Sequence, residues 1–227
     1  MPGLEHLPFA EAWFHEVDDE RWRAASDAAR AIGKTGLEAW TTDKTPDVVS
    51  FLEARGYEPV RRYVISELDV AAAAGPDTPA FQLVTFAERP DLATELFAIA
   101  REAYGDQPGR AEQRLESLES WRTWGLDPHP PEAYFIALEG ERVLGYGFLH
   151  VEGDTWWHGF LAVARAARGR GVAGAIKRGQ IAWAKEHGVR ALRTATEERL
   201  LGLLALNRRL GYRPLYTEIV LRGPAAE

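Results

Sequence analysis

A segment near the start of the chain is repeated close to its end, and this repeat restricts the possible folds more than any other feature. Gly-Tyr-Glu-Pro at residues 56–59 corresponds to Gly-Tyr-Arg-Pro at residues 211–214, an offset of 155 residues. The same offset places Gly33 on Gly188 without a gap. In both copies the apolar spacing predicts a helix, a glycine stop, a short strand, a second helix and, after the Gly-Tyr-x-Pro turn, another strand. The chain is therefore expected to contain two related α/β units.

The second copy is the longer one, because it has an upstream part that the first copy lacks. In the first copy we predict helices at 21–32 and 47–55 and strands at 37–41 and 60–68. In the second copy the corresponding helices are predicted at 172–187 and 200–210, and the strands at 191–196 and 215–221. The upstream part is predicted to hold a strand at 81–86, helices at 91–105 and 111–125, a hairpin turning at Glu139-Gly140 and a strand at 155–163. The predicted organisation is a half domain at 1–70, a Gly- and Pro-containing linker at 71–79 and a complete domain at 80–227.

Composition excludes several classes of protein. The net charge of the 227 residues is −7, so the basic excess that a general nucleic-acid binder needs is missing. The sequence has no cysteine, which excludes disulfides and thiolate metal sites and fits a cytoplasmic location. It has no apolar run of about 18 residues and no secretory signal pattern, so no membrane association is expected. No metal site is predicted.

Two arginines alternate with glycines directly before the predicted helix at 172–187, in the stretch Arg168-Gly169-Arg170-Gly171-Val172-Ala173. A strand that leads through a glycine-rich turn into a helix exposes free backbone N–H groups at the positive end of the helix dipole. Glycine lets the backbone approach an anion closely, and arginine adds charge and paired donors. Taken alone, the stretch is equally compatible with a basic helix cap on the surface. The order of the surrounding elements favours a diphosphate site.

In that order of elements, the stretch at 168–173 resembles the Gln/Arg-x-x-Gly-x-Gly/Ala motif of the GCN5-related N-acetyltransferase (GNAT) family, and residues 207–214 resemble its closing helix and turn. The resemblance covers about residues 79–223 in full and 1–68 as a C-terminal half-copy, so the chain is similar to a truncated tandem member. It implies the GNAT fold, an α/β fold with a mixed, mostly antiparallel central sheet flanked by helices.

The resemblance also implies acetyl-CoA or another acyl-CoA as co-substrate. The diphosphate would bind the backbone of Arg168, Gly169, Arg170, Gly171, Val172 and Ala173. The pantetheine arm would pair with the strand edge at Leu161, Ala162 and Val163, where the fourth and fifth strands of the family separate. In the first copy, the offset of 155 places Trp13, Glu16 and Asp18 where the second copy has its motif. An acidic segment repels diphosphate, so the first copy is expected to be non-catalytic.

The residues of the chemical step are less clearly marked. Because there is no cysteine, the acceptor is expected to attack the thioester directly in a ternary complex. A protonated amine must first lose a proton, and His150, Glu152, Asp154 and His158 lie on or beside the predicted strands that would flank the site. We favour His158 and Glu152 as catalytic residues. A structural role for the histidine and a surface role for the glutamate stay open.

Many family members carry a tyrosine in the last helix that protonates the departing thiolate. The corresponding position here is Asn207, which cannot supply a proton by ionising. We expect Asn207 to contact the CoA arm, and a helix-capping role is the alternative. Trp121, Trp124 and Tyr104 are expected either to line the acceptor side of the site or to belong to the core.

The most specific hypothesis is an N-acetyltransferase that moves an acetyl group from acetyl-CoA to a primary amine. A small-molecule amine is the expected partner, with a protein amino group as the alternative and a homodimer possible. Two other classes stay open. A catalytically inactive acyl-CoA-binding or regulatory module would bind CoA without turnover, and a purely structural interaction protein would not bind CoA.

Overall fold

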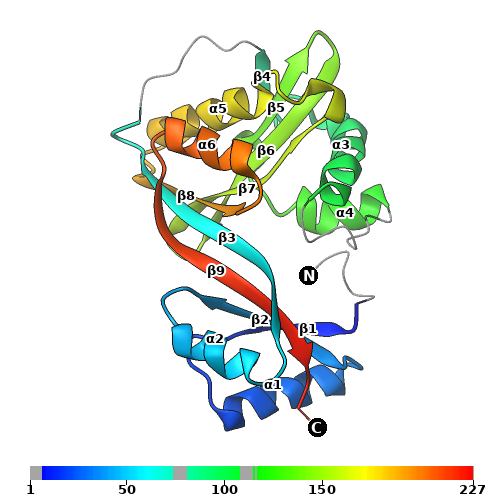
Figure 1. Cartoon of the computed structure of the whole chain (residues 1–227). Coiled ribbons are helices and arrows are strands. Elements are labelled where there is room, and N and C mark those ends of the chain that lie inside the picture. Colours follow the sequence, from blue (N-terminus) through cyan, green and yellow to red (C-terminus); the bar gives the residue numbers. More distant parts are fainter. Residues whose placement is uncertain (1–6, 74–80, 108–114, 116, 227) are drawn as a thin grey trace.

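The computed structural model describes residues 7–73, 81–107, 115 and 117–226, and its centre is one nine-stranded sheet in the order β1-β2-β9-β3-β8-β7-β6-β5-β4 (Figure 1). The strands are β1 (Phe9–Trp13), β2 (Gly36–Thr42), β3 (Glu58–Asp69), β4 (Gln82–Thr85), β5 (Tyr134–Glu139), β6 (Arg142–Glu152), β7 (Thr155–Val163), β8 (Ala191–Glu197) and β9 (Arg213–Pro224). The helices are α1 (Asp19–Ala31), α2 (Pro46–Glu53), α3 (Ala93–Gly105), α4 (Leu118–Gly125), α5 (Val172–Glu186) and α6 (Leu201–Arg209). Short 3₁₀ turns lie at Pro90–Leu92, Pro131–Ala133 and Arg165–Ala167.

The sheet is mixed and mostly antiparallel, as predicted. Only β1 with β2 and β7 with β8 pair in parallel, and the other neighbours are antiparallel. In Figure 1, β1, β2, α1 and α2 form a lower lobe, and the elements from β4 to α6 form an upper lobe. The long strands β3 and β9 run through both lobes and join them.

The strand order departs from the predicted division into a half domain followed by a complete one. Strand β3 comes from the first copy but lies between β8 and β9, while β9 from the end of the chain lies between β2 and β3. Both new pairings are long. Strand β3 pairs with β8 from Tyr63–Glu197 to Asp69–Ala191, and β2 pairs with β9 from Gly36–Pro224 to Thr42–Glu218. Each strand therefore supplies backbone partners that the other copy would otherwise leave at an open sheet edge.

The elements repeat in the way that the sequence offset predicts. Strand β2, helix α2 and strand β3 begin at residues 36, 46 and 58, and β8, α6 and β9 begin at 191, 201 and 213. The four glycines that end helices in the two copies all have positive φ, from 69° to 94°, a conformation that glycine adopts without strain: Gly33, Gly56, Gly188 and Gly211. The sequence analysis did not anticipate β1, which pairs in parallel with β2 as β7 pairs with β8.

The upper lobe has a helix layer on each face of the sheet. Along β6, Gly147 faces Ile176 of α5, whereas the neighbouring Phe148 packs in the core under α3 and α4. Trp121 and Tyr104 are buried in that same core, and Trp124 packs against it. These three aromatic residues thus belong to the core, the second of the two roles expected for them.

Two details of the predicted elements differ from the structure. Thr45 and Pro46 have the residue types expected at the start of a helix, but the hydroxyl group of Thr45 donates to the carbonyl group of Thr42 and does not cap α2. The helix predicted at 111–125 is described only from Leu118, where Ser117 caps it by accepting a hydrogen bond from the N–H of Ser120. Most of its predicted first part, and most of the predicted linker, lie outside the described residues.

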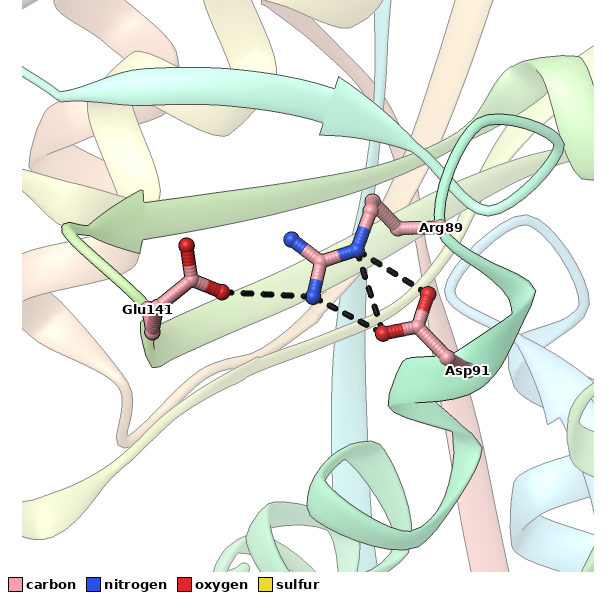
Figure 2. Close-up of polar contacts among 3 residues, drawn as sticks. All are labelled: Arg89, Asp91 and Glu141. Carbon is pink, nitrogen blue, oxygen red and sulfur yellow. Dashed lines mark hydrogen bonds and ion pairs between the residues drawn. The ribbon is translucent and has the colours of Figure 1, made fainter.

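A surface ion-pair cluster joins the segment after β4 to the turn between β5 and β6. The Arg89 guanidinium donates to both carboxylate oxygens of Asp91 at 2.8–3.1 Å and reaches Glu141 at 3.5 Å (Figure 2). Hydrogen bonding from Arg89 lowers the pKa of Asp91. These side chains are solvent-exposed, so the cluster orients the turn and contributes little to stability. No helix in the described residues is long and apolar enough to cross a membrane.

Candidate functional site

A cavity of about 740 Å³ opens where β7 and β8 separate. The two parallel strands are paired from Trp156–Leu192 to His158–Thr194, although β7 continues to Val163 and β8 to Glu197. Beyond the last pair, residues of both strand ends line the cavity: Gly159, Phe160, Leu161, Val163, Ala195, Thr196 and Glu197. Beyond that pair the two strand edges do not pair with each other, although the Val163 carbonyl group accepts from Nε of Arg168 at 3.1 Å and the Glu197 carbonyl group from the N–H of Leu200 at 3.0 Å.

The separation of the strands has a local cause in β7. Gly147 of β6 pairs with Leu161 and Leu149 pairs with His158, so two residues of β7 oppose the single residue Phe148. This bulge bends β7 at the point where its pairing with β8 ends. A Cβ atom at Gly159 would lie 2.0 Å from the Phe148 ring. Glycine is thus required at this position, and the sequence analysis did not single it out.

One end of the cavity is formed by the glycine–arginine stretch at the start of α5. Gly169 and Gly171 have φ values of 76° and 87°, and Gly171 is the N-cap of the helix. The first N–H groups of α5 have no partners within the helix. The stretch contributes these residues to the cavity wall: Arg168, Gly169, Gly171, Val172 and Ala173. An anion at this end would meet backbone donors and the positive end of the helix dipole.

The arginines of this region are held by carboxylates. Arg168 and Arg165 both pair with Asp106 at the end of α3, at 2.8 Å and 2.6 Å. Hydrogen bonds from Arg165 first, and then from Arg168, lower the pKa of Asp106 to about 2. Arg170 pairs instead with Glu139 at 2.5 Å and does not contribute to the described cavity wall. The predicted diphosphate contact of Arg170 is therefore the least supported of the six.

A buried polar cluster lies where β7 and β8 begin to separate. His158 donates from Nδ1 to Oε1 of Gln180 at 2.8 Å, and the hydroxyl group of Tyr212 donates to its Nε2. Burial first, and then the charge of Lys177, hold the pKa of His158 well below its ordinary value. His158 lines the cavity as a neutral ring with both nitrogens engaged. This geometry favours the structural role over the catalytic one that we preferred from the sequence.

Lys177 of α5 is part of the same cluster, and the sequence analysis did not consider it. Its side chain lines the cavity but is almost fully buried, with an exposed fraction of 1%. Nζ lies 3.4 Å from Oγ1 of Thr194 and 4.8 Å from the centre of the Tyr212 ring. Burial lowers the pKa of this amine to about 7. The signal in the sequence was a lysine at a position of the helix where the spacing calls for an apolar residue.

Three other predicted site residues lie away from the cavity wall. Glu152 is exposed at the end of β6, outside the cavity. Asn207 is buried, and its Nδ2 donates to Oγ1 of Thr196 at 2.9 Å. Ala162 packs in the core on the α3 side of the sheet. Glu152, Asn207 and Ala162 are thus not among the described residues that line the cavity.

The first copy contributes one side chain to the cavity, Tyr63 of β3. Its ring stacks on Trp40 at 5.7 Å, and Trp40 stacks on Trp13 at 5.1 Å. On β9, Glu218 lies directly opposite Tyr63. Burial first, and then the negative charge of Glu152, raise the pKa of Glu218 to about 7. Glu218 is thus a titratable carboxyl group one strand away from the cavity wall that the sequence did not reveal.

The model of the acetyltransferase (GNAT) family matches residues 93–212, which is more than half of the chain. The chain belongs to the GNAT family. The match begins at α3 and ends at Tyr212, so it contains the cavity elements β7, α5 and β8. The family resemblance inferred from the motif is confirmed.

Solved GNAT structures are similar to this chain over nearly its whole length. A GCN5-related N-acetyltransferase from Sphaerobacter thermophilus has a TM-score of 0.76 at 19% identity, covering 96% of this chain and 74% of its own. A tandem GNAT protein from the clavulanic acid biosynthesis pathway has a TM-score of 0.73 at 18% identity, covering 98% and 77%. A third, from Kribbella flavida, has a TM-score of 0.63 at 18% identity, covering 99% and 79%. At these identities the similarity shows the fold alone. A search of curated protein sequences found no significant match.

Proposed function

We propose that this GNAT protein is an N-acetyltransferase that moves an acetyl group from acetyl-CoA to a primary amine within a ternary complex. The observation that carries the proposal is the cavity between the separated ends of β7 and β8, with the N-terminus of α5 at one end. Seven of the ten residues predicted to bind CoA line it: Leu161, Val163, Arg168, Gly169, Gly171, Val172 and Ala173. Family membership supports an acyltransferase activity for such a cavity.

The chemistry and the size of the cavity support acetyl-CoA as the co-substrate. The diphosphate would bind at the N–H groups of the first turn of α5, beside Arg168. The amide groups of the pantetheine arm would pair with the free edge of β7 at Leu161 and Val163. A volume of about 740 Å³ lies within the roughly 300–1,000 Å³ range of small-molecule sites. Donors on the edge of β7 would polarise the thioester carbonyl group.

We assign to Glu218 the role of accepting the proton that the acceptor amine loses. An alkylamine has a pKa near 10.4 and must lose a proton before it attacks. His158 has both ring nitrogens engaged, whereas Glu218 has a pKa of about 7 and lies opposite Tyr63, which reaches the cavity. Glu152 contributes by its charge, which favours the protonated form of Glu218. A nearby pair of carboxyl groups also suits a cationic acceptor, so a small-molecule amine is the first acceptor class to test.

The first 70 residues act as a structural half-copy in this proposal. The equivalent of the diphosphate site is closed there, because the carboxylate of Asp18 caps α1 by accepting a hydrogen bond from the N–H of Arg21 at 2.8 Å. Glu16 pairs with the Arg21 guanidinium at 2.7 Å and adds further negative charge. The role of this segment is to place β3, and with it Tyr63, beside β8.

The test is binding followed by turnover. Calorimetric titration with acetyl-CoA should show one site per chain, and a panel of small amines, followed by peptides with free amino groups, should release CoA thiol. Binding without thiol release for any amine would favour the inactive acyl-CoA-binding module. Absence of CoA binding would contradict the proposal and leave a structural interaction protein.

A further inference from the structure

Lys177 is the feature of the cavity that the proposed function does not yet use. It lies about one and a half helical turns after the start of α5, and its side chain points toward β8 at Thr194, the last residue paired with β7. A lysine is almost never buried without a carboxylate partner. Among the residues that the structure describes, Lys177 forms no ion pair with a carboxylate and is held by a hydroxyl group and a ring face. The amine therefore lies at the cavity wall with no opposite charge to balance it.

Among the groups of the buried polar cluster, Lys177 is the one that changes its charge near neutral pH. Tyr212 packs against Lys177 before β9. The polar or titratable side chains that line the cavity with Lys177 are Tyr63 on β3, His158 on β7, Thr194, Thr196 and Glu197 on β8, Arg178 on α5, Arg209 on α6, and Asp106, Gln107 and Arg168 at the end with the glycine–arginine stretch. Burial keeps His158 unprotonated and Tyr212 protonated near neutral pH. The Glu197 carboxylate is occupied by the Arg199 guanidinium at 2.5 Å. A negative charge that develops in the cavity would therefore meet one ammonium group that is close, buried and able to give up a proton.

A sulfur atom is the group on which such a charge develops. Cleavage of the thioester C–S bond leaves the electron pair on sulfur, and the resulting thiolate needs a proton or a positive charge. Asn207 stands where many family members have the tyrosine that donates this proton. Its amide donates to Thr196, which lines the cavity, but Asn207 itself does not line it. The proton must then come from another group, either a side chain or a water molecule.

We propose that Lys177 is the catalytic acid of this enzyme and protonates the CoA sulfur as the C–S bond breaks. This inference rests on the proposed acetyl transfer. The amine nitrogen forms the new N–C bond, the C–S electron pair goes to sulfur, and a proton moves from Nζ to sulfur, so CoA leaves as a thiol and Lys177 is left neutral. The acceptor enters as an ammonium ion and loses two protons. One passes to Glu218 and from there to solvent, and the other restores the charge of Lys177.

The acid strengths match this role. A free thiol has a pKa of about 8.5. The ammonium group of Lys177, with a pKa of about 7, lies within roughly 1.5 pKa units of the thiol, so the proton can pass to the sulfur without a large free-energy cost. An ordinary lysine, with a pKa near 10.4, would hold the proton too tightly for this step. Burial of Lys177 is therefore what makes it an effective donor.

The experiment measures the ionisation of bound CoA and needs no acceptor. Ultraviolet absorbance of the thiolate is followed against pH in complexes of CoA with the parent, Lys177→Met and Lys185→Met, the last being an exposed lysine on the same helix. We expect the thiolate to appear at least about one pH unit lower in the parent and Lys185→Met than in Lys177→Met, because a cation within about 4–6 Å lowers a thiol pKa by roughly 1–3 units. Equal midpoints in all three proteins would overturn the assignment.

Desulfo-CoA, which lacks the sulfur atom, separates this interaction from the rest of the site. Between about pH 7 and 8, Lys177→Met should bind CoA a few-fold more weakly than the parent and should bind desulfo-CoA equally well, because Lys177 still carries part of its charge in this range. Retained desulfo-CoA binding also shows that the variant is folded. If Lys177→Met fails to fold, a thiol pKa at or above 8.5 in the parent complex still refutes the proposal. Failure of the parent to bind either compound would contradict the acetyltransferase function itself.

Discussion

Replacement of Gly171 by glutamate tests the diphosphate site most directly. Gly171 is the N-cap of α5 at φ 87°, and a Cβ atom there would meet no heavy atom within 4 Å. The substitution therefore causes backbone strain without a steric clash, at about 1–2 kcal/mol for a non-glycine residue in the left-handed region. In a chain of this size that strain should lower the melting temperature by roughly 2–8 °C.

The loss of CoA affinity should be larger than this strain. A carboxylate roughly 5 Å from a phosphate charge, at an effective dielectric constant of about 20, opposes binding by roughly 3 kcal/mol. That corresponds to a Kd about 100-fold weaker or more. Gly56→Glu is the matched control, because Gly56 has φ 79°, has open space at its Cβ position and lies in the first copy.

Calorimetry with CoA and thermal unfolding of both variants check the reasoning. The two proteins should lose similar stability, and only Gly171→Glu should lose affinity. Equal CoA affinity in Gly171→Glu and the parent would show that the diphosphate does not bind at the start of α5. Equal loss in both variants would show that the affinity depends on global stability and not on the local charge.

Three further results are expected. Deletion of residues 1–70 removes β3 from between β8 and β9, so the product should be insoluble or strongly destabilised; a soluble protein with the parent melting temperature would show that the segment is dispensable. Glu218→Gln should lower the rate of thiol release by about 100-fold or more with CoA affinity unchanged. In the parent, the rate should fall as the pH drops below about 7, because the pKa of Glu218 is raised to about 7 and the protonated form cannot accept a proton; this decline should be absent in Glu218→Gln. Asn207→Ala removes the hydrogen bond to Thr196 and should lower the free energy of unfolding by about 1–2 kcal/mol; a thousandfold loss of turnover with CoA binding intact would instead make Asn207 part of the chemical step.

The sequence by itself determined the local structure and the glycine-rich turn at one end of the cavity. Helix ends at Gly33, Gly56, Gly188 and Gly211 were predictable because a glycine after an amphipathic run is the residue that adopts positive φ without strain. The backbone N–H donors at residues 168–173 were also predictable, because a glycine-rich turn before a helix exposes them whatever the surrounding fold. The repeat offset of 155 also predicted that β2, α2 and β3 correspond in the sequence to β8, α6 and β9.

Only the tertiary structure decided which strands are neighbours and which side chains become acids or bases. Periodicity gives the apolar face of β3, but the insertion of β3 between β8 and β9 depends on partners more than 100 residues away. Ionisation follows the same rule. The helix spacing marks Lys177 as a lysine at an apolar position, but only packing removes water from Lys177 and Glu218 and moves both pKa values to about 7. Desolvation is a property of the assembled fold, and it is what turns these two residues into candidates for the chemical step.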